Sequence, residues 1–178
     1  VLEHIKKLGG KFEIASYAEL NILRKIGVNP GDVLYSNPVK SLRDIRLAYK
    51  AGVRCFAFQS EDELTKFAAS QRADDKINAY LRVATSAGKS TVASESKFGQ
   101  SIVSESDRFQ ALQLMKLAGD LNLIPHGVAF HVGSQMENPE AWTEPLKNVA
   151  LFMKILQQNG IHLSMLDIGG GFPAYHAA

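Results

Sequence analysis

The chain of 178 residues is 46% hydrophobic and 21% charged, a composition typical of one globular domain that can bury a core. Twenty basic and eighteen acidic side chains leave a formal net charge of +2, so we expect no nucleic-acid partner. No apolar run approaches the roughly 20 residues of a membrane-spanning helix, so no membrane partner is expected, and the single cysteine, Cys55, fits a cytoplasmic location without an internal disulfide.

The apolar pattern predicts strands that alternate with helices along the chain. An opening helix is predicted to end at Gly9 and Gly10. Short apolar, β-branched or aromatic runs predict strands at 12–15, 33–35, 53–58, 77–84, 127–132 and 163–168. Helical spacing predicts helices at 17–26, 42–51, 61–71, 107–121 and within 139–159, where Pro145 favours a start near Thr143 after a separate turn.

Polar residues and glycines mark the predicted helix ends. Three serines, each with an acidic residue three positions later, fit the capping box or a shorter version of it: Ser16 with Glu19, Ser41 with Asp44, and Ser60 with Glu63. Left-handed glycines are expected to close helices at Gly27, Gly52 and Gly160.

Six βα units with short connections predict an α/β fold with a parallel sheet and right-handed crossovers. A barrel and a doubly wound sheet would both satisfy this pattern. No GxGxxG motif follows the first strand, and the glycine cluster comes after the last strand instead. This favours an incomplete TIM-type (β/α)8 barrel, in which functional residues lie at the carboxyl ends of the strands.

Those strand ends carry groups suited to an anionic, planar ligand. The triplet 169–171 can expose backbone amides to a phosphate, although a flexible turn is the alternative, and Asp167 is expected to orient this loop. His131 could stack on a flat cofactor or act as a base; the alternative is a hydrogen-bonded structural histidine. No histidine or carboxylate pair has metal-ligand spacing, so no metal site is predicted.

Arg82 ends an otherwise apolar predicted strand, and a guanidinium in that position normally requires a carboxylate partner. Glu13, also within a strand pattern, is the obvious candidate. The pair could support a ligand or be a structural ion pair inside the barrel. Cys55 is expected to be a small core residue rather than a nucleophile.

Several motifs together resemble the fold type III pyridoxal-phosphate decarboxylases, of the ornithine decarboxylase-like family. In chain order they are FEIAS (12–16), YSNPVK (35–40), LRVAT (81–85), KFG (97–99), FHVGSQ (130–135) and LDIGGGFP (166–173). The succession of the last two is the most specific. The resemblance implies that residues 1–178 are a fragment of an alanine racemase-like barrel that binds pyridoxal 5'-phosphate. The first, lysine-bearing strand, the last barrel strand and a C-terminal β domain would lie outside it.

The resemblance also implies roles for individual residues. His131 would stack on the pyridine ring and serve in catalysis, and Arg82 with Glu13 would lie beneath the cofactor. Ser134 and the amides around Gly171 would hold the phosphate, with the other two loop residues, Gly169 and Gly170, shaping the loop. Lys97 would lie near the interface of a homodimer.

The activity implied by the resemblance is decarboxylation of L-ornithine to putrescine in polyamine biosynthesis, with the fragment alone inactive. Lysine/ornithine or diaminopimelate decarboxylation is the alternative, although the NPVK string and the Arg82–Thr85 string favour ornithine. A non-catalytic homologue that regulates its active relative by heterodimerisation is a further alternative.

Overall fold

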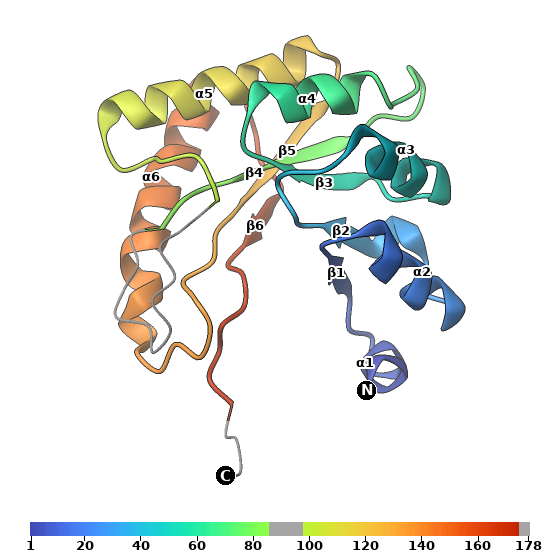
Figure 1. The fold of residues 1–178 in the computed structure, drawn as a ribbon. Helices are drawn as coiled ribbons and strands as arrows, with labels where there is room; N and C mark the ends of the chain where they lie inside the picture. Colours follow the sequence, from blue (N-terminus) through green and yellow to red (C-terminus); the bar gives the residue numbers. More distant parts are fainter. Residues whose placement is uncertain (86–97, 175–178) are drawn as a thin grey trace.

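The computed structural model describes residues 1–85 and 98–174, which form a single α/β fold around one sheet (Figure 1). The strands are β1 (Phe12–Ile14), β2 (Val33–Tyr35), β3 (Cys55–Phe58), β4 (Asn78–Arg82), β5 (Ile124–Ala129) and β6 (Met165–Asp167). The helices are α1 (Leu2–Lys7), α2 (Tyr17–Lys25), α3 (Leu42–Ala51), α4 (Glu61–Ala68), α5 (Glu105–Asp120) and α6 (Thr143–Gln158), with short 3-10 helices η1 (Pro30–Asp32) and η2 (Pro139–Trp142).

All five strand pairings are parallel, and the strands lie in the order β1-β2-β3-β4-β5-β6. Sequential order without a reversal is the arrangement of a barrel, whereas a doubly wound sheet changes direction at a switch point. The sheet curls into an open half-barrel, with the helices that connect the strands on its outer side (Figure 1). The prediction of an incomplete TIM-type barrel is confirmed.

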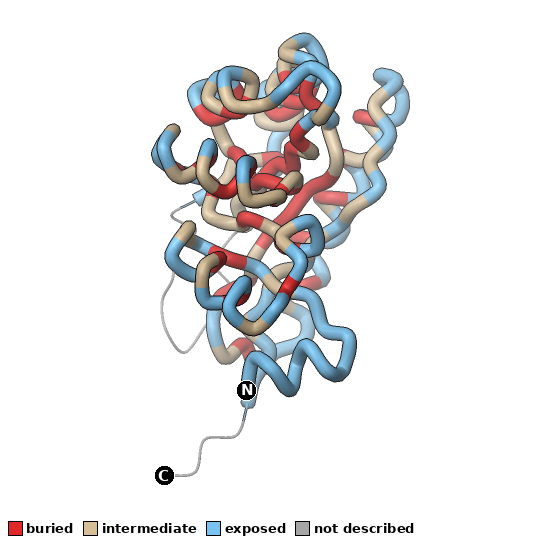
Figure 2. Tube along the Cα trace, turned by 90° about the vertical axis from the view of Figure 1, so that its right-hand side faces the viewer, coloured by how far each residue is buried: buried red, intermediate tan, exposed pale blue. Residues whose placement is uncertain are grey.

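The core divides between the two faces of the sheet because successive side chains point to opposite sides. The outer face packs large residues such as Tyr35, Phe56 and Phe58 against the helices. Figure 2 shows where the buried residues of both faces lie along the chain. The inner face holds a smaller cluster built from Cys55, Ala57, Tyr80 and Ala129. Cys55 is therefore the small core residue that the sequence predicts.

The helix ends confirm most of the predicted signals. The hydroxyls of Ser16 and Ser41 accept from backbone amides three residues later, at 3.3 and 3.0 Å. The three predicted closing glycines have positive φ: Gly27 at 73°, Gly52 at 115° and Gly160 at 77°. Helix α6 begins at Thr143 after η2, with Pro145 in its first turn, where a missing amide hydrogen removes no helical hydrogen bond.

One predicted cap and one predicted helix start differ from the structure. The capping box at Ser60 is wrong, because Ser60 makes no side-chain cap and Glu63 turns into the core to pair with Lys40. Helix α5 begins two residues earlier than expected, behind a capping box in which Ser104 and Asp107 exchange hydrogen bonds at 3.1 and 3.0 Å. No helix in the described part of the chain is long and apolar enough to cross a membrane.

Candidate cofactor site

The loop after β6 is packed against the segment that follows β5. Gly170 donates its backbone N–H to Nδ1 of His131 at 3.2 Å, and Met136 donates its backbone N–H to the carbonyl of Gly171 at 2.8 Å. The carbonyl of His131 in turn accepts from the Thr85 hydroxyl at 2.8 Å, beyond β4. Residues from three strand ends are thus joined at one mouth of the half-barrel.

Two of the loop glycines lie where no other residue would fit. Gly169 has φ +69°, and a Cβ there would lie 2.4 Å from the carbonyl oxygen of Phe130. Gly171 has φ +87°, and its Cβ would lie 1.8 Å from the carbonyl oxygen of Gly133. Because both the backbone angles and the close approach require glycine, the loop is a constrained turn. The N–H groups of Gly169 and Gly170 already bond to Asp167 and His131, whereas the N–H of Gly171 has no partner among the described residues.

Asp167 orients this loop, as the sequence predicts. Its Oδ1 accepts the backbone N–H of Gly169 at 2.7 Å. The carboxylate thereby fixes the turn at the point where β6 ends.

His131 is half-buried beside the glycine loop. Partial burial and, to a smaller extent, the charge of Arg82 lower the pKa of this imidazole, so the ring is neutral at neutral pH. Because Nδ1 accepts the amide hydrogen of Gly170, the remaining proton lies on Nε2. A neutral, oriented ring is suited to stacking on an aromatic ligand.

Ser134 lies in the same turn and is exposed, and no described residue hydrogen-bonds to its hydroxyl. That hydroxyl is therefore free to bind an anion in front of the glycine loop. Lys97, the residue expected at a subunit interface, lies outside the described residues.

Three ionisable side chains, from Glu13, Arg82 and Asp167, interact across the concave face of the half-barrel. Glu13 is exposed at the open side, but partial desolvation raises the pKa of its carboxyl to about 7, and the charge of Asp167 and a hydrogen bond with it act in the same direction. β1 and β6 are the two edges of the sheet, so the curl of the sheet is what brings these carboxyls together.

Arg82 lies in the field of both carboxyls, and Asp167 contributes more than Glu13 to holding the guanidinium charged. Burial lowers the pKa of Arg82. No ion pair within 4.0 Å joins the expected partners Arg82 and Glu13 in the described structure, and the buried Nε of Arg82 has no hydrogen-bond partner there. Asp167, which sequence reasoning assigned only to the loop, is thus a second carboxylate in whose field Arg82 lies, and it too forms no described ion pair with Arg82.

Sequence reasoning missed Tyr80, whose buried hydroxyl faces the same concave side without a described hydrogen-bond partner. Tyr80 lies between Ala79 and Leu81, which face the helices, so the alternation of side chains along β4 could have predicted that Tyr80 faces the concave side. The neighbouring Cys55 thiol has a pKa raised to about 12 by burial, which argues against a nucleophilic role.

These residues fit a flat, phosphorylated cofactor. The constrained glycine loop and the free Ser134 hydroxyl suit a phosphate, the neutral His131 ring suits an aromatic face, and the unpaired Nε of Arg82 is a donor still to be satisfied. Within residues 1–85 and 98–174, no group of three or more His, Cys, Asp or Glu side chains could hold a metal ion.

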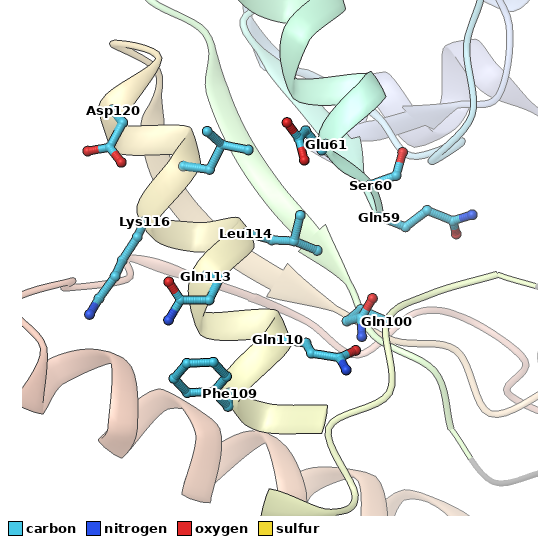
Figure 3. Close-up of a pocket in the computed structure, with 11 residues that line it drawn as sticks. Gln59, Ser60, Glu61, Gln100, Phe109, Gln110, Gln113, Leu114, Lys116 and Asp120 are labelled. Atoms are coloured by element: carbon cyan, nitrogen blue, oxygen red, sulfur yellow. The ribbon is translucent and has the colours of Figure 1, made fainter. Parts of the chain in front are cut away.

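A separate cavity of about 670 Å³ lies on the outer side of the sheet, between α4 and α5 (Figure 3). It is lined by Gln59, Ser60, Glu61, Gln100, Phe109, Gln110, Gln113, Leu114, Lys116, Leu117 and Asp120. None of the strand-end residues named above contributes to it, so this cavity is not part of the candidate cofactor site.

Comparison with known families gives a match over the whole chain. Residues 1–178 match the profile described as pyridoxal-dependent decarboxylase, pyridoxal binding domain. The lysine/ornithine decarboxylase of Selenomonas ruminantium is 35% identical over 97% of this chain and 42% of the relative. Antizyme inhibitor 2 of Xenopus laevis and ornithine decarboxylase of Rattus norvegicus are each 33% identical over 97% of this chain and 36% of the relative. The chain thus spans about two fifths of the length of these relatives.

Solved structures give the same picture. A crystal structure of lysine decarboxylase from Selenomonas ruminantium superposes with a TM-score of 0.85 at 35% identity, over 97% of this chain and 43% of that one. The lysine/ornithine decarboxylase of Vibrio vulnificus, complexed with cadaverine, superposes with a TM-score of 0.81 at 31% identity, over the same shares of the two chains. A third, the arginine decarboxylase of Paramecium bursaria Chlorella virus, superposes with a TM-score of 0.85 at 27% identity, over 96% of this chain and 44% of that one.

Proposed function

Since the chain belongs to the pyridoxal-dependent decarboxylases, we propose that it is the cofactor-binding part of an enzyme that converts L-ornithine to putrescine. Pyridoxal 5'-phosphate is the cofactor of the matched domain, and a related structure, SrLDC, is a complex with this cofactor and cadaverine. The observation that carries the proposal is the glycine loop at 169–171, built without side chains and hydrogen-bonded to His131.

The proposal assigns a role to each residue of the candidate cofactor site. Ser134 and the amides around Gly171 bind the phosphate, and the His131 ring stacks on the pyridine ring. When bound, the cofactor supplies an electron sink for the electron pair released as carbon dioxide leaves the substrate. Arg82 lies beneath the cofactor as a fixed positive charge, and Glu13, with a pKa of about 7, holds or releases a proton on its carboxyl near neutral pH.

Ornithine is proposed as the substrate because the motif strings favour it and because ornithine decarboxylases are among the relatives. Lysine/ornithine decarboxylation is the nearest alternative, supported by the relative from Selenomonas ruminantium, and diaminopimelate decarboxylation is more distant. We further propose a cytoplasmic homodimer, with Lys97 near its interface, that acts in polyamine biosynthesis.

A non-catalytic homologue is the second candidate. Antizyme inhibitor 2 is as similar to this chain as the ornithine decarboxylase of Rattus norvegicus, at 33% identity. Such a protein would keep the barrel and regulate an active relative by forming heterodimers with it.

The test is a decarboxylation assay on the full chain that contains these residues. It is incubated with pyridoxal phosphate and, separately, with carboxyl-labelled ornithine, lysine, arginine or diaminopimelate, and labelled carbon dioxide is measured. We expect the highest kcat/KM with ornithine. Faster release from another amino acid would reassign the substrate, and no release from any would favour the non-catalytic candidate.

His131→Ala in the same full chain tests the stacking role. We expect weaker cofactor retention and slower decarboxylation at an unchanged melting temperature of the cofactor-free protein, because a half-buried residue facing the mouth contributes little to the core. His126→Ala is a matched control, since His126 lies within β5 and contacts Ser164 away from the glycine loop. A lowered melting temperature with unchanged cofactor affinity would show that His131 is a structural residue.

A further inference from the structure

The side chain of Gln135 binds both backbone groups of one residue beyond the glycine loop. Its Nε2 donates to the carbonyl of Ala174 at 3.1 Å, and its Oε1 accepts the N–H of Ala174 at 3.0 Å. A carboxamide that makes both bonds to one residue restrains its distance and its orientation. With the bond from Met136 to Gly171, the loop is held at its middle and at its far end.

The backbone at Gln135 does not by itself call for a glutamine. Its φ of 50° lies in the left-handed region, which glycine adopts without strain and most other residues avoid. Among the described residues other than glycine, only Asn122 shares a positive φ. Glycine would satisfy the backbone of this turn, so the carboxamide of Gln135 is explained by its two hydrogen bonds to Ala174 and not by the turn itself.

A stacked aromatic pair restrains the same loop at a second point. The rings of Trp142 and Phe172 lie 5.0 Å apart at an interplanar angle of 12°, which joins η2 to the residue that follows Gly171. Gln135 and Trp142 thus hold residues 172 and 174 on either side of Pro173, while Gly170 and Gly171 bond to His131 and Met136. All these restraints come from one segment, residues 131–142.

We propose that Gln135 is a positioning residue that holds the loop 169–174 in the shape that receives the phosphate of the cofactor. This role rests on the proposed function, since it assumes that the loop binds that phosphate. Gln135 itself acts through the backbone of Ala174 and has no assigned contact with the cofactor. Its loss should therefore weaken binding of a phosphorylated ligand and spare a ligand without the phosphate.

The experiment compares Gln135→Gly and Gln135→Ala with the unchanged full chain. The dissociation constants of pyridoxal phosphate and of pyridoxal, which lacks the phosphate, are measured by absorbance titration of the cofactor-free protein, together with its melting temperature. Gln135→Gly removes the carboxamide while suiting the positive φ, so folding is preserved. Gln113→Ala is the matched control, because Gln113 is an exposed glutamine on α5 that lines the outer cavity (Figure 3).

We expect both Gln135 variants to bind pyridoxal phosphate about tenfold more weakly, since two hydrogen bonds that shape the loop are lost. Binding of pyridoxal should change less than twofold, and Gln113→Ala should behave as the unchanged chain. Equal weakening of both ligands, or full retention of the preference for the phosphate, would overturn the role of Gln135. If the unchanged chain itself shows no preference for pyridoxal phosphate over pyridoxal, the proposed function of the loop is wrong, and the role of Gln135 falls with it.

Discussion

At the scale of single residues, the concave face of the half-barrel is organised by opposing charges. Asp167 interacts with three groups, since it accepts from the backbone N–H of Gly169 and its charge acts on both Glu13 and Arg82. A carboxylate that accepts from a loop amide and lies in the field of a guanidinium connects the shape of the glycine loop to the charges on the concave face. The pKa of Glu13 therefore depends on the charges of both Asp167 and Arg82.

The raised pKa of Glu13 predicts a pH dependence of stability. The carboxyl has a pKa of about 7 in the folded chain against 4.5 as a free group, so the folded state holds its proton more tightly. The stabilisation that this proton supplies is complete below about pH 4.5 and is lost as the pH rises through about 7. Glu13→Gln should remove this dependence. Melting temperatures of the cofactor-free full chain between pH 4.5 and 8 test it; identical profiles for both proteins would contradict the raised pKa.

The partners of Arg82 can be ranked by double-mutant cycles. Asp167 makes the larger contribution to holding Arg82 charged, although no ion pair within 4.0 Å joins Arg82 to either carboxyl in the described structure. We expect the coupling energy of Arg82→Met with Asp167→Asn to exceed that of Arg82→Met with Glu13→Gln, both measured by denaturant unfolding of the full chain. Purely additive losses in both cycles would show that Arg82 is paired with neither carboxyl.

At the scale of the elements, a buried ion pair between Lys40 and Glu63 links the turn after β2 to α4. Lys40 Nζ lies 3.0 Å from Oε2 of Glu63, and both side chains are almost fully buried, at 0% and 2% exposed. Lys40 also donates to the carbonyls of Asn37 and Ala57, at 2.7 and 2.6 Å, and Glu63 bonds to Lys66 as well. This network holds the YSNPVK segment, which leads from β2 into α3, on the outer face of the sheet.

Removing one partner of this pair should be strongly destabilising. Lys40→Met leaves the Glu63 carboxylate buried, with Lys66 as its remaining described cation and the backbone N–H at position 40 as a neutral donor, and such a loss is worth about 3–5 kcal/mol. Lys147→Met is the matched control, since Lys147 and Glu144 form a pair that is 67% and 68% exposed and is worth at most about 0.5 kcal/mol. Denaturant unfolding of the full chain measures both. Equal effects of the two substitutions would mean that the buried pair carries no special stability.

At the scale of the whole molecule, the described sheet ends in two unpaired parallel strands, β1 and β6. On the outer face near β6, Leu166 and Ile168 remain 42% and 37% exposed. Unpaired strand edges and uncovered apolar faces are templates for association with other chains.

The isolated piece 1–178 is therefore expected to associate or aggregate in solution. It should bind a dye specific for exposed apolar surface and elute as a mixture of sizes, whereas the full chain should do neither. Size-exclusion chromatography with light scattering, run at several concentrations, measures this. A monodisperse monomer of 1–178 with a sharp two-state melt would contradict the open half-barrel.

Much of the fold could be predicted because it depends on near neighbours in the sequence. The periods of apolar residues located the six described strands and the helices between them, and Gly27, Gly52 and Gly160 ended helices where expected. Strand ends shifted by a few residues, as at β4, because pairing with neighbouring strands decides where a strand stops. The absence of an early glycine motif was enough to favour the barrel over the doubly wound sheet.

The candidate site was predicted in its residue types and only partly in its contacts. His131 and the glycine loop could be found because strand ends in a parallel barrel share one mouth. The hydrogen bond from Gly170 to His131 follows from that shared mouth, whereas the carboxamide of Gln135 on Ala174 depends on how two loops fold over each other. No local pattern indicates which of several polar side chains makes such a contact.

By itself, the sequence determined the order of strands and helices and the barrel class, and it indicated residues such as His131 and the glycine loop at the strand ends. Tertiary structure decided which side chains pair. Glu63 forms an ion pair with Lys40 instead of the predicted capping box with Ser60, and Glu13 interacts with Asp167 across the concave face. The physical reason is distance along the chain. Periodicity and capping are set by residues a few positions apart, whereas the partners of a charge are set by the curl of the sheet, which brings its two edges together.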